Sequence, residues 1–200
     1  MSETMHRDDA GAKFGMWLFL FTELLLFGGL FVLYAVYLSR YPEAFASGSS
    51  ELSVVFGTVN TLVLISSSLT VAVSVTALRR GNARLAQTML GIAVIAAAVF
   101  MVNKYFEWSA KIHHGLYAGS PELKERATGE GVFFGLYYFT TGLHGLHVVI
   151  GAAILAWVFF LVRGGKVTSE NFITLENAGL YWHLVDLVWI FVFPLYYLIL

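Results

Sequence analysis

The sequence contains no cysteine and few charged residues. Only 12% of its 200 residues are charged, whereas charged residues make up roughly 25% of a typical soluble domain. Without cysteine, the chain cannot form disulfides, attach c-type haem covalently, bind copper through a thiolate or hold an iron–sulfur cluster. The formal net charge of −1 and the lack of a basic cluster argue against a nucleic-acid partner.

Long apolar runs dominate the sequence, and 58% of the residues are hydrophobic. Apolar runs of about 18 or more residues with few charges predict transmembrane helices. The first run is too long for a secretory signal and contains Glu23. We therefore expect an all-α polytopic membrane protein, with a polar lead-in over residues 1–13 and a single membrane domain over residues 14–200. Its five predicted helices cover residues 14–38, 52–78, 85–108, 131–162 and 177–200.

The distribution of lysine and arginine predicts the orientation in the membrane, because cytoplasmic segments carry an excess of these residues. With the N-terminus in the cytoplasm, seven of them lie on the inner side and five on the outer side. We therefore expect a cytoplasmic N-terminus. The inner residues are Arg7, Lys13, Arg79, Arg80, Arg84, Arg163 and Lys166, and the outer residues are Arg40, Lys104, Lys111, Lys124 and Arg126.

Two smaller features concern how the helices pack and connect. Asn60, Ser67 and Ser74 recur at intervals of seven residues, which indicates a stripe of small polar residues for helix packing. The segment 109–130 is the longest predicted loop, and Pro194 is expected to kink the last helix.

Ionisable residues inside the apolar runs are the most informative feature. Charged side chains are costly in hydrocarbon, and intramembrane ionisable residues usually have a function. Glu23 lies near the middle of the first predicted helix. Two interpretations are open: a protonated carboxyl bonded to a neighbouring helix, or a carboxyl that exchanges protons or faces lipid.

The fourth and fifth helices carry the remaining candidates. His144 and His147 are three residues apart and share a helix face, and the neighbouring Gly142 and Gly145 allow close approach of another helix. Hydrogen bonding between helices is the simpler interpretation, and a haem or metal ligand is the alternative, with His183 as a second ligand. No carboxylate cluster with metal-ligand spacing accompanies these histidines, so we expect no metal site and no catalytic residue.

Two further pairs have a predicted structural role. Asp186 lies one turn after His183, so a contact between them would lessen the cost of burying both groups. Lys104 and Glu107 lie at the outer end of the third helix, where such a pair is expected to be an interfacial anchor.

The chain resembles subunit III of the haem–copper oxidases, the cytochrome c oxidase subunit 3 family. Four blocks carry the resemblance, and together they extend over most of the chain from about residue 14. They are Trp17–Leu24 (WLFLFTEL), Tyr105–Glu107 (YFE), Gly131–Gly151 with its TTGLHGLH core, and Glu176–Phe191 around YWHLVD. Many members have seven helices, and this chain is similar to the five-helix form that lacks the first two.

The resemblance also implies which residues form the site. The membrane carboxylate of the family falls on Glu23, its paired histidines on His144 and His147, and its terminal polar residues on His183 and Asp186. These residues are expected to form a polar network between helices.

Three other positions bear on this resemblance. Glu107 on the outer side and Glu176 on the inner side fall on acidic positions of the family pattern. Lys104 departs from it, because some relatives have an acidic residue there. A proton-collecting role at the outer site is therefore in doubt, and the loss of two helices is expected to alter the lipid cleft of seven-helix members.

The function implied by the resemblance is that of a subunit without a redox centre. Such a subunit packs on the catalytic subunit I beside subunit II, binds phospholipid, and supports proton uptake and durable turnover in the aerobic respiratory chain. No cofactor is expected on this chain, because haem and copper belong to the partner subunits. The implied location is the bacterial cytoplasmic membrane.

Four alternatives remain open at this point. The chain could be subunit III of a quinol oxidase or the accessory subunit of a nitric oxide reductase, because the sequence shows no electron-donor site. It could be a stand-alone proton-coupled transporter, although five helices without inverted repeats fit that class poorly. It could also be a b-type haem protein that uses His144 or His147 with His183.

Overall fold

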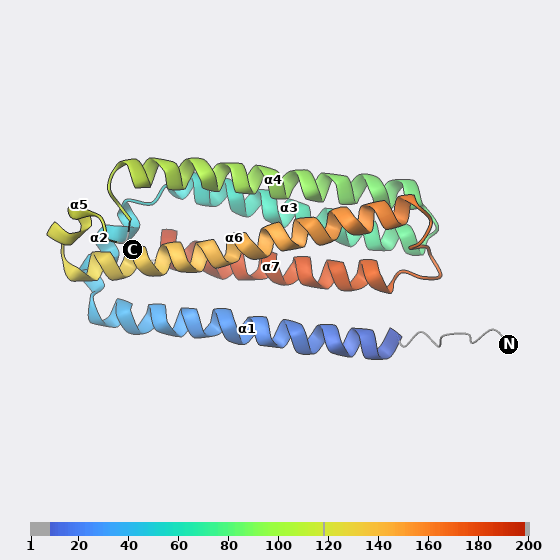
Figure 1. Cartoon of the computed structure of the whole chain (residues 1–200), viewed down its shortest axis with the longest axis horizontal. Helices are drawn as coiled ribbons and strands as arrows, with labels where there is room; N and C mark the ends of the chain where they lie inside the picture. Colours follow the sequence, from blue (N-terminus) through green and yellow to red (C-terminus); the bar gives the residue numbers. More distant parts are fainter. Residues whose placement is uncertain (1–8, 118, 199–200) are drawn as a thin grey trace.

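A computed structural model describes residues 9–117 and 119–198. Within these ranges the chain is helical and contains no strand, as the sequence predicts. Five of the helices are long and apolar enough to cross a membrane, and they lie lengthwise beside one another (Figure 1). They are α1 (Asp9–Arg40), α3 (Val54–Arg79), α4 (Ala83–His113), α6 (Thr128–Arg163) and α7 (Ile173–Tyr197).

Two short helices lie in segments that the sequence analysis left as connections. Helix α2 (Pro42–Ser50) begins with a proline, which suits the first helical position because that amide has no helical partner. Helix α5 (Pro121–Glu125) is capped by the Ser120 hydroxyl, which accepts a hydrogen bond from the Leu123 amide at 3.1 Å. Both helices lie at one end of the bundle, called here the α2–α5 end (Figure 1).

Four of the long helices form a closed ring, in which α3 packs on α4, α4 on α6, α6 on α7 and α7 back on α3. Helix α1 packs outside this ring, against α6 and α7, and among the described residues it does not contact α3 or α4. Helix α7 is therefore surrounded by three long helices. Because of this position, α7 carries the largest buried share of the five spans.

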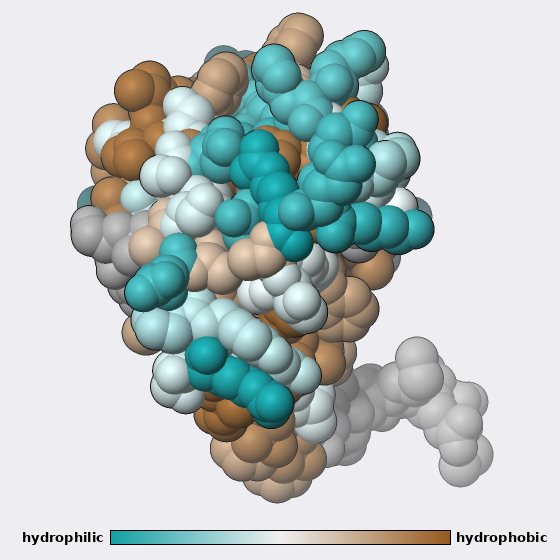
Figure 2. Space-filling model, turned by 90° about the vertical axis from the view of Figure 1, so that its left-hand side faces the viewer, coloured by the Kyte–Doolittle hydropathy of each residue, from teal (hydrophilic) through white to brown (hydrophobic). Residues whose placement is uncertain are grey.

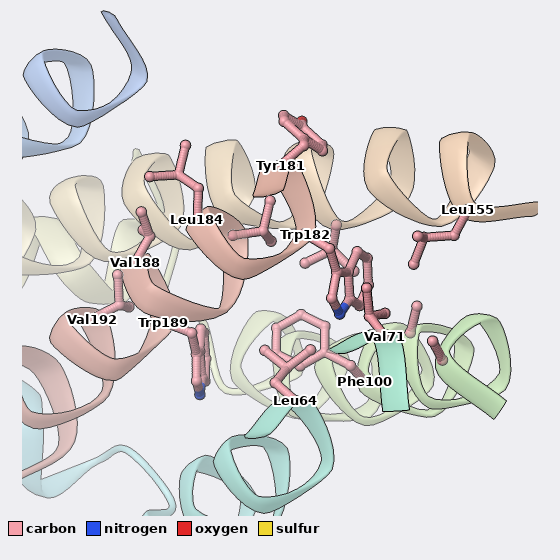
Figure 3. Close-up of a cluster of buried hydrophobic side chains, with 14 of the residues drawn as sticks. Leu64, Val71, Phe100, Leu155, Tyr181, Trp182, Leu184, Val188, Trp189 and Val192 are labelled. Carbon is pink, nitrogen blue, oxygen red and sulfur yellow. The ribbon is translucent and has the colours of Figure 1, made fainter. Parts of the chain in front are cut away.

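The centre of the ring is filled by two tryptophans of α7 (Figure 3). Trp182 and Trp189 are fully buried. Their indole Nε1 groups donate to Ser67 Oγ at 3.1 Å and Thr61 Oγ1 at 3.0 Å on α3. The buried polar positions of α3 therefore satisfy the indole donors of α7. This contact gives Ser67 of the predicted polar stripe a specific partner.

The closest approach of α6 and α7 is at Gly151. A Cβ atom there would lie 2.8 Å from the Trp182 ring and 3.2 Å from the Tyr181 ring. At Gly142 and Gly145, where the sequence suggested a close crossing, a Cβ would lie 3.3 Å from Trp108 and 3.9 Å from Met101. The close packing of α6 on α7 is therefore set by the large indole of α7, about two turns away from the glycines that the sequence favoured.

Pro194 does not end the last helix. Helix α7 continues past it to Tyr197, and the Leu198 amide donates to the Pro194 carbonyl at 3.1 Å. Neighbouring helices commonly stabilise a proline inside a transmembrane helix.

The contact at Gly151 leads to a stability prediction. Gly151→Ala should lower the free energy of unfolding by about 1–3 kcal/mol, because overpacking forces the Trp182 ring or the backbone to move. Unfolding of the detergent-solubilised protein, followed by circular dichroism, measures this loss. Gly135→Ala on the same helix is the control, since nothing lies within 4 Å of its added Cβ. Equal stability of the two variants would contradict the tight crossing.

Candidate functional site

A carboxylate–histidine pair joins α1 to α6 near the middle of α1. Glu23 Oε2 lies 2.9 Å from His147 Nε2. Both side chains are largely enclosed, with 14% of Glu23 and 11% of His147 exposed. The pair connects two of the residues that the sequence analysis selected, although 124 positions separate them.

The proton count of this pair follows from the second ring nitrogen. His147 Nδ1 lies 2.7 Å from the Leu143 carbonyl oxygen, and a carbonyl can only accept a hydrogen bond. Nδ1 must therefore carry a proton. The contact at Nε2 then joins either an imidazolium to a carboxylate or a neutral imidazole to a protonated carboxyl. In both forms one proton lies between Glu23 and His147.

The pair lines a groove between α1, α6 and α7. The groove has a volume of about 560 Å³. Apart from Glu23 and His147, its lining is largely apolar and aromatic and includes Phe19, Trp157 and Tyr181. Tyr181 also fixes the pair, since its ring stacks on His147 with a centroid distance of 6.4 Å. The groove can therefore hold an apolar chain next to a proton-bearing polar pair.

At the end of the bundle opposite α2 and α5, Glu176 of α7 connects to two other helices. Its carboxylate accepts a hydrogen bond from Arg79 Nη2 of α3 at 2.6 Å and forms an ion pair with Lys13 Nζ of α1 at 2.8 Å. Because both cations are nearly half exposed, each pair contributes only about 0–1 kcal/mol. Glu176 therefore links three helices at the membrane surface.

A second polar cluster is buried between α4, α6 and α7. Lys104 Nζ donates to Glu107 Oε2 at 2.8 Å and to the hydroxyls of Tyr137 and Tyr197, each at 3.1 Å. Both tyrosine hydroxyls donate to Glu107 Oε1, at 3.0 Å from Tyr137 and 2.7 Å from Tyr197. We call these four residues the lysine cluster.

The burial of the lysine cluster corrects the expectation of an interfacial anchor. Lys104 is 5% exposed and Glu107 is 2% exposed. The spacing of the pair along α4 was visible in the sequence, but its tyrosine partners come from two other helices. Lys104 uses all three ammonium donors within the cluster, so the group is a neutral and internally satisfied unit. The aromatic rings within 6 Å of Lys104 Nζ are Trp108, Tyr137, Trp189 and Tyr197.

The remaining predicted residues lie apart from these two sites. His144 is fully buried between Phe100 and Trp189, with ring-centroid distances of 5.5 Å and 5.1 Å. Neither of its ring nitrogens has a hydrogen-bond partner among the described residues. His144 and His147 therefore have different environments, although they lie on the same helix.

His183 and Asp186 do not bond each other. His183 Nδ1 lies 2.6 Å from Ser68 Oγ on α3. Both Asp186 carboxyl oxygens are buried and without a hydrogen-bond partner in the described part of the chain. Ser68 also interacts with Asp186, but without hydrogen-bond geometry. The five residues expected to form one network are therefore divided into a bonded pair, a buried imidazole and a group around Ser68.

The α2–α5 end carries a polar surface (Figure 2). Arg126 Nη1 donates to Glu130 at 3.1 Å and to Glu51 at 3.4 Å. The hydrogen bond that Arg126 donates to Glu130 raises the pKa of Arg126 above its usual value, so the guanidinium stays charged. Lys111 Nζ donates to the Glu51 backbone oxygen at 3.0 Å. These contacts fasten the short connecting segments onto the ends of α4 and α6.

The fold and the buried polar groups define a class of protein. It is an integral membrane protein with five apolar helices, and several of its ionisable side chains bond across helix boundaries. No group of three or more potential metal ligands occurs in the ranges that the structure describes.

Comparison with known proteins identifies the family. Residues 3–199 match the family model described as cytochrome c oxidase subunit III. The chain is 33% identical to cytochrome c oxidase subunit 3 of the bacterium Synechocystis, over 93% of this chain and 75% of that protein. The chain therefore belongs to the cytochrome c oxidase subunit III family of the haem–copper oxidases, as an integral protein of the bacterial membrane.

Two other relatives show the range of the family. The chain is 30% identical to the cytochrome bo(3) ubiquinol oxidase subunit 3 of Pseudomonas aeruginosa, over 96% of this chain and 88% of that protein. It is also 31% identical to part of a haem–copper oxidase subunit I+III of Aeropyrum pernix, over 92% of this chain and 22% of that protein. Relatives of this chain thus include subunits of oxidases named for different donors and a protein that fuses subunits I and III.

The lysine cluster leads to a prediction about charge burial. Lys104→Met and Glu107→Gln should each lower the free energy of unfolding by about 3–5 kcal/mol, since each leaves a buried partner uncompensated. The double variant should lose clearly less than the sum of the two. Denaturation of the purified protein by sodium dodecyl sulfate provides this double-mutant cycle.

The matched control for this cycle is Lys13→Met. Lys13 also pairs with a glutamate but is 45% exposed, so its loss should cost about 0–1 kcal/mol. Additive losses in the Lys104 and Glu107 variants would show that the two residues do not act as a unit.

Proposed function

We propose that this chain is the non-catalytic subunit III of a haem–copper terminal oxidase that accepts electrons from cytochrome c. In this proposal it packs on subunit I, in a complex that also contains subunit II, and haem and copper reside in those partners. The observation that carries the proposal is the family match over nearly the whole chain. The fused subunit I+III relative supports a direct association with subunit I.

The proposed contribution to proton uptake rests on the Glu23–His147 pair. The contact of Nδ1 with the Leu143 carbonyl places a proton on Nδ1, which supports a second, shared proton between His147 Nε2 and Glu23. It also lies at the edge of the bundle, where α1 meets α6. A group of this kind can exchange a proton with a neighbouring subunit and thereby support lasting turnover of the complex.

The proposed lipid binding rests on the groove beside the same pair. Its volume of about 560 Å³ and its largely apolar lining suit an acyl chain of a phospholipid. Lipid held there would fill the space between α1 and the ring of four helices and stabilise the position of α1.

Co-purification tests the subunit assignment. The tagged chain, isolated in mild detergent from its host membrane, is expected to bring down oxidase subunits I and II, and a reduced-minus-oxidised spectrum should show their haem. Recovery of the chain alone and without colour would contradict the assignment and favour a transporter. Haem bound to the chain alone would identify a b-type cytochrome.

Glu23→Gln tests the proposed proton exchange. The glutamine amide can still donate to His147 Nε2, so assembly with subunits I and II should be unchanged. The amide cannot carry the transferable proton, so the complex should lose activity after several-fold fewer turnovers. Oxygen consumption with reduced cytochrome c, followed over many turnovers, measures this. Glu170→Gln, which changes an exposed loop residue, is the control. Identical time courses for the Glu23→Gln complex and the unaltered complex would show that Glu23 is only structural.

A quinol oxidase is the second candidate, because one relative belongs to a ubiquinol oxidase. Oxygen consumption by the purified complex with cytochrome c and with ubiquinol separates the two assignments. Activity with ubiquinol but not with cytochrome c would identify the quinol as the electron donor.

A further inference from the structure

A second groove lies between α1 and α7 and differs chemically from the groove at Glu23. It has a volume of about 560 Å³. Seven of its eight lining residues are Trp, Phe or Leu, and His183 is the eighth. Large parts of its walls are open, since Trp17 and Phe21 are each 58% exposed and Leu187 is 43% exposed. A single imidazole thus lies in an apolar groove near the middle of the membrane-spanning segment.

His183 has one free ring nitrogen. Its Nδ1 contacts Ser68 Oγ at 2.6 Å, which fixes the orientation of the ring. Its Nε2 makes no hydrogen bond within the described part of the chain. Because hydrocarbon offers no hydrogen-bond partner, a free polar atom at this depth is unfavourable. A ligand that covers the groove should therefore provide a polar partner.

Two other grooves that contain ionisable residues do not share this requirement. In the groove beside Glu23, the ionisable groups are bonded to each other. In the groove between α4 and α6, Lys104 already donates to three oxygen atoms of the protein. Acyl chains can fill both without leaving these groups unpaired. An acyl chain in the α1–α7 groove would leave His183 Nε2 without a partner.

The carboxyl next to this groove is also unsatisfied. Asp186 lies one turn after His183, and its buried oxygens have no hydrogen-bond partner among the described residues. Ser68 is close to both residues, since it bonds His183 and interacts with Asp186. The group formed by Ser68, His183 and Asp186 therefore contains polar atoms without a partner, which favours an incoming polar side chain over a lipid tail.

We infer that the α1–α7 groove is a docking site for a transmembrane helix of the catalytic oxidase subunit, and that a hydrogen-bonding side chain of this helix pairs with His183 Nε2. This inference rests on the proposed function. A transmembrane helix fits because it brings its own satisfied backbone, apolar side chains for the groove walls and one polar side chain at the depth of His183. The fused relative, in which subunits I and III form one chain, is consistent with close contact between the two.

Site-specific photo-crosslinking tests the location of the contact. Benzoylphenylalanine replaces Leu187 in the groove, or Ile95 on α4 as the control, which is 65% exposed. The full chain is produced together with the oxidase subunits, irradiated in membranes and digested for mass spectrometry. A crosslink from position 187 to a transmembrane helix of subunit I, at least tenfold stronger than from position 95, is the expected result.

Other results of this experiment overturn the inference in distinguishable ways. If subunit I co-purifies but position 187 reacts only with lipid, the groove faces the bilayer and the proposed function stands. A crosslink to a second copy of this chain would assign the groove to self-association. If subunit I does not co-purify at all, the proposed function and the inference both fail.

A second measurement tests the role of His183. His183→Leu introduces an apolar side chain of similar bulk and removes the proposed hydrogen bond of Nε2 with the partner helix. The amount of subunit I retained per chain after detergent washing should therefore fall about fivefold to tenfold. His183→Gln, which keeps a donor and an acceptor, should restore most of it. Unfolding temperatures of the isolated chains show whether both variants fold. Equal retention by His183→Leu and the unaltered chain would overturn the pairing.

Discussion

The lack of water in the bilayer core governs this structure, because each polar group there needs a partner inside the protein. The backbone meets this constraint through its long helices, and the side chains meet it across helix boundaries. Indole donors of α7 reach hydroxyls of α3, Glu23 of α1 reaches His147 of α6, and Lys104 of α4 reaches hydroxyls of α6 and α7. Hydrogen bonds therefore specify which helix faces which, while apolar packing supplies the bulk of the contact.

The same constraint separates three kinds of polar site. The lysine cluster satisfies each of its charges internally, which suits a structural joint between three helices. The Glu23–His147 pair is satisfied by one shared hydrogen bond and borders an open groove. In the group of Ser68, His183 and Asp186, the carboxyl oxygens have no hydrogen-bond partner among the described residues. The three sites therefore differ in how far the protein itself satisfies their polar atoms, and this difference is the basis of the roles proposed for them.

The sequence predicted the helices and most of the site residues, because apolar runs and rare intramembrane charges are visible in one dimension. It did not predict their partners. Spacing along one helix suggested a bond between His183 and Asp186, yet the imidazole bonds Ser68 of another helix. Spacing also identified Lys104 with Glu107, but their burial depends on tyrosines 30 or more positions away. The short helix α2 was missed although its proline marks a helix start.

The position of α1 and the chemistry of Glu23 depend on the same bond. Helix α1 lies outside the closed ring. Its other polar links to the long helices lie toward its ends, for example from Lys13 to Glu176 and from Tyr34 to the Leu195 carbonyl. The middle of α1 is therefore held mainly by the bond between Glu23 and His147. If the pair exchanges a proton, as proposed above, linkage requires that each protonation state of the pair binds α1 with its own strength. Under this proposal, proton exchange and the attachment of α1 are coupled.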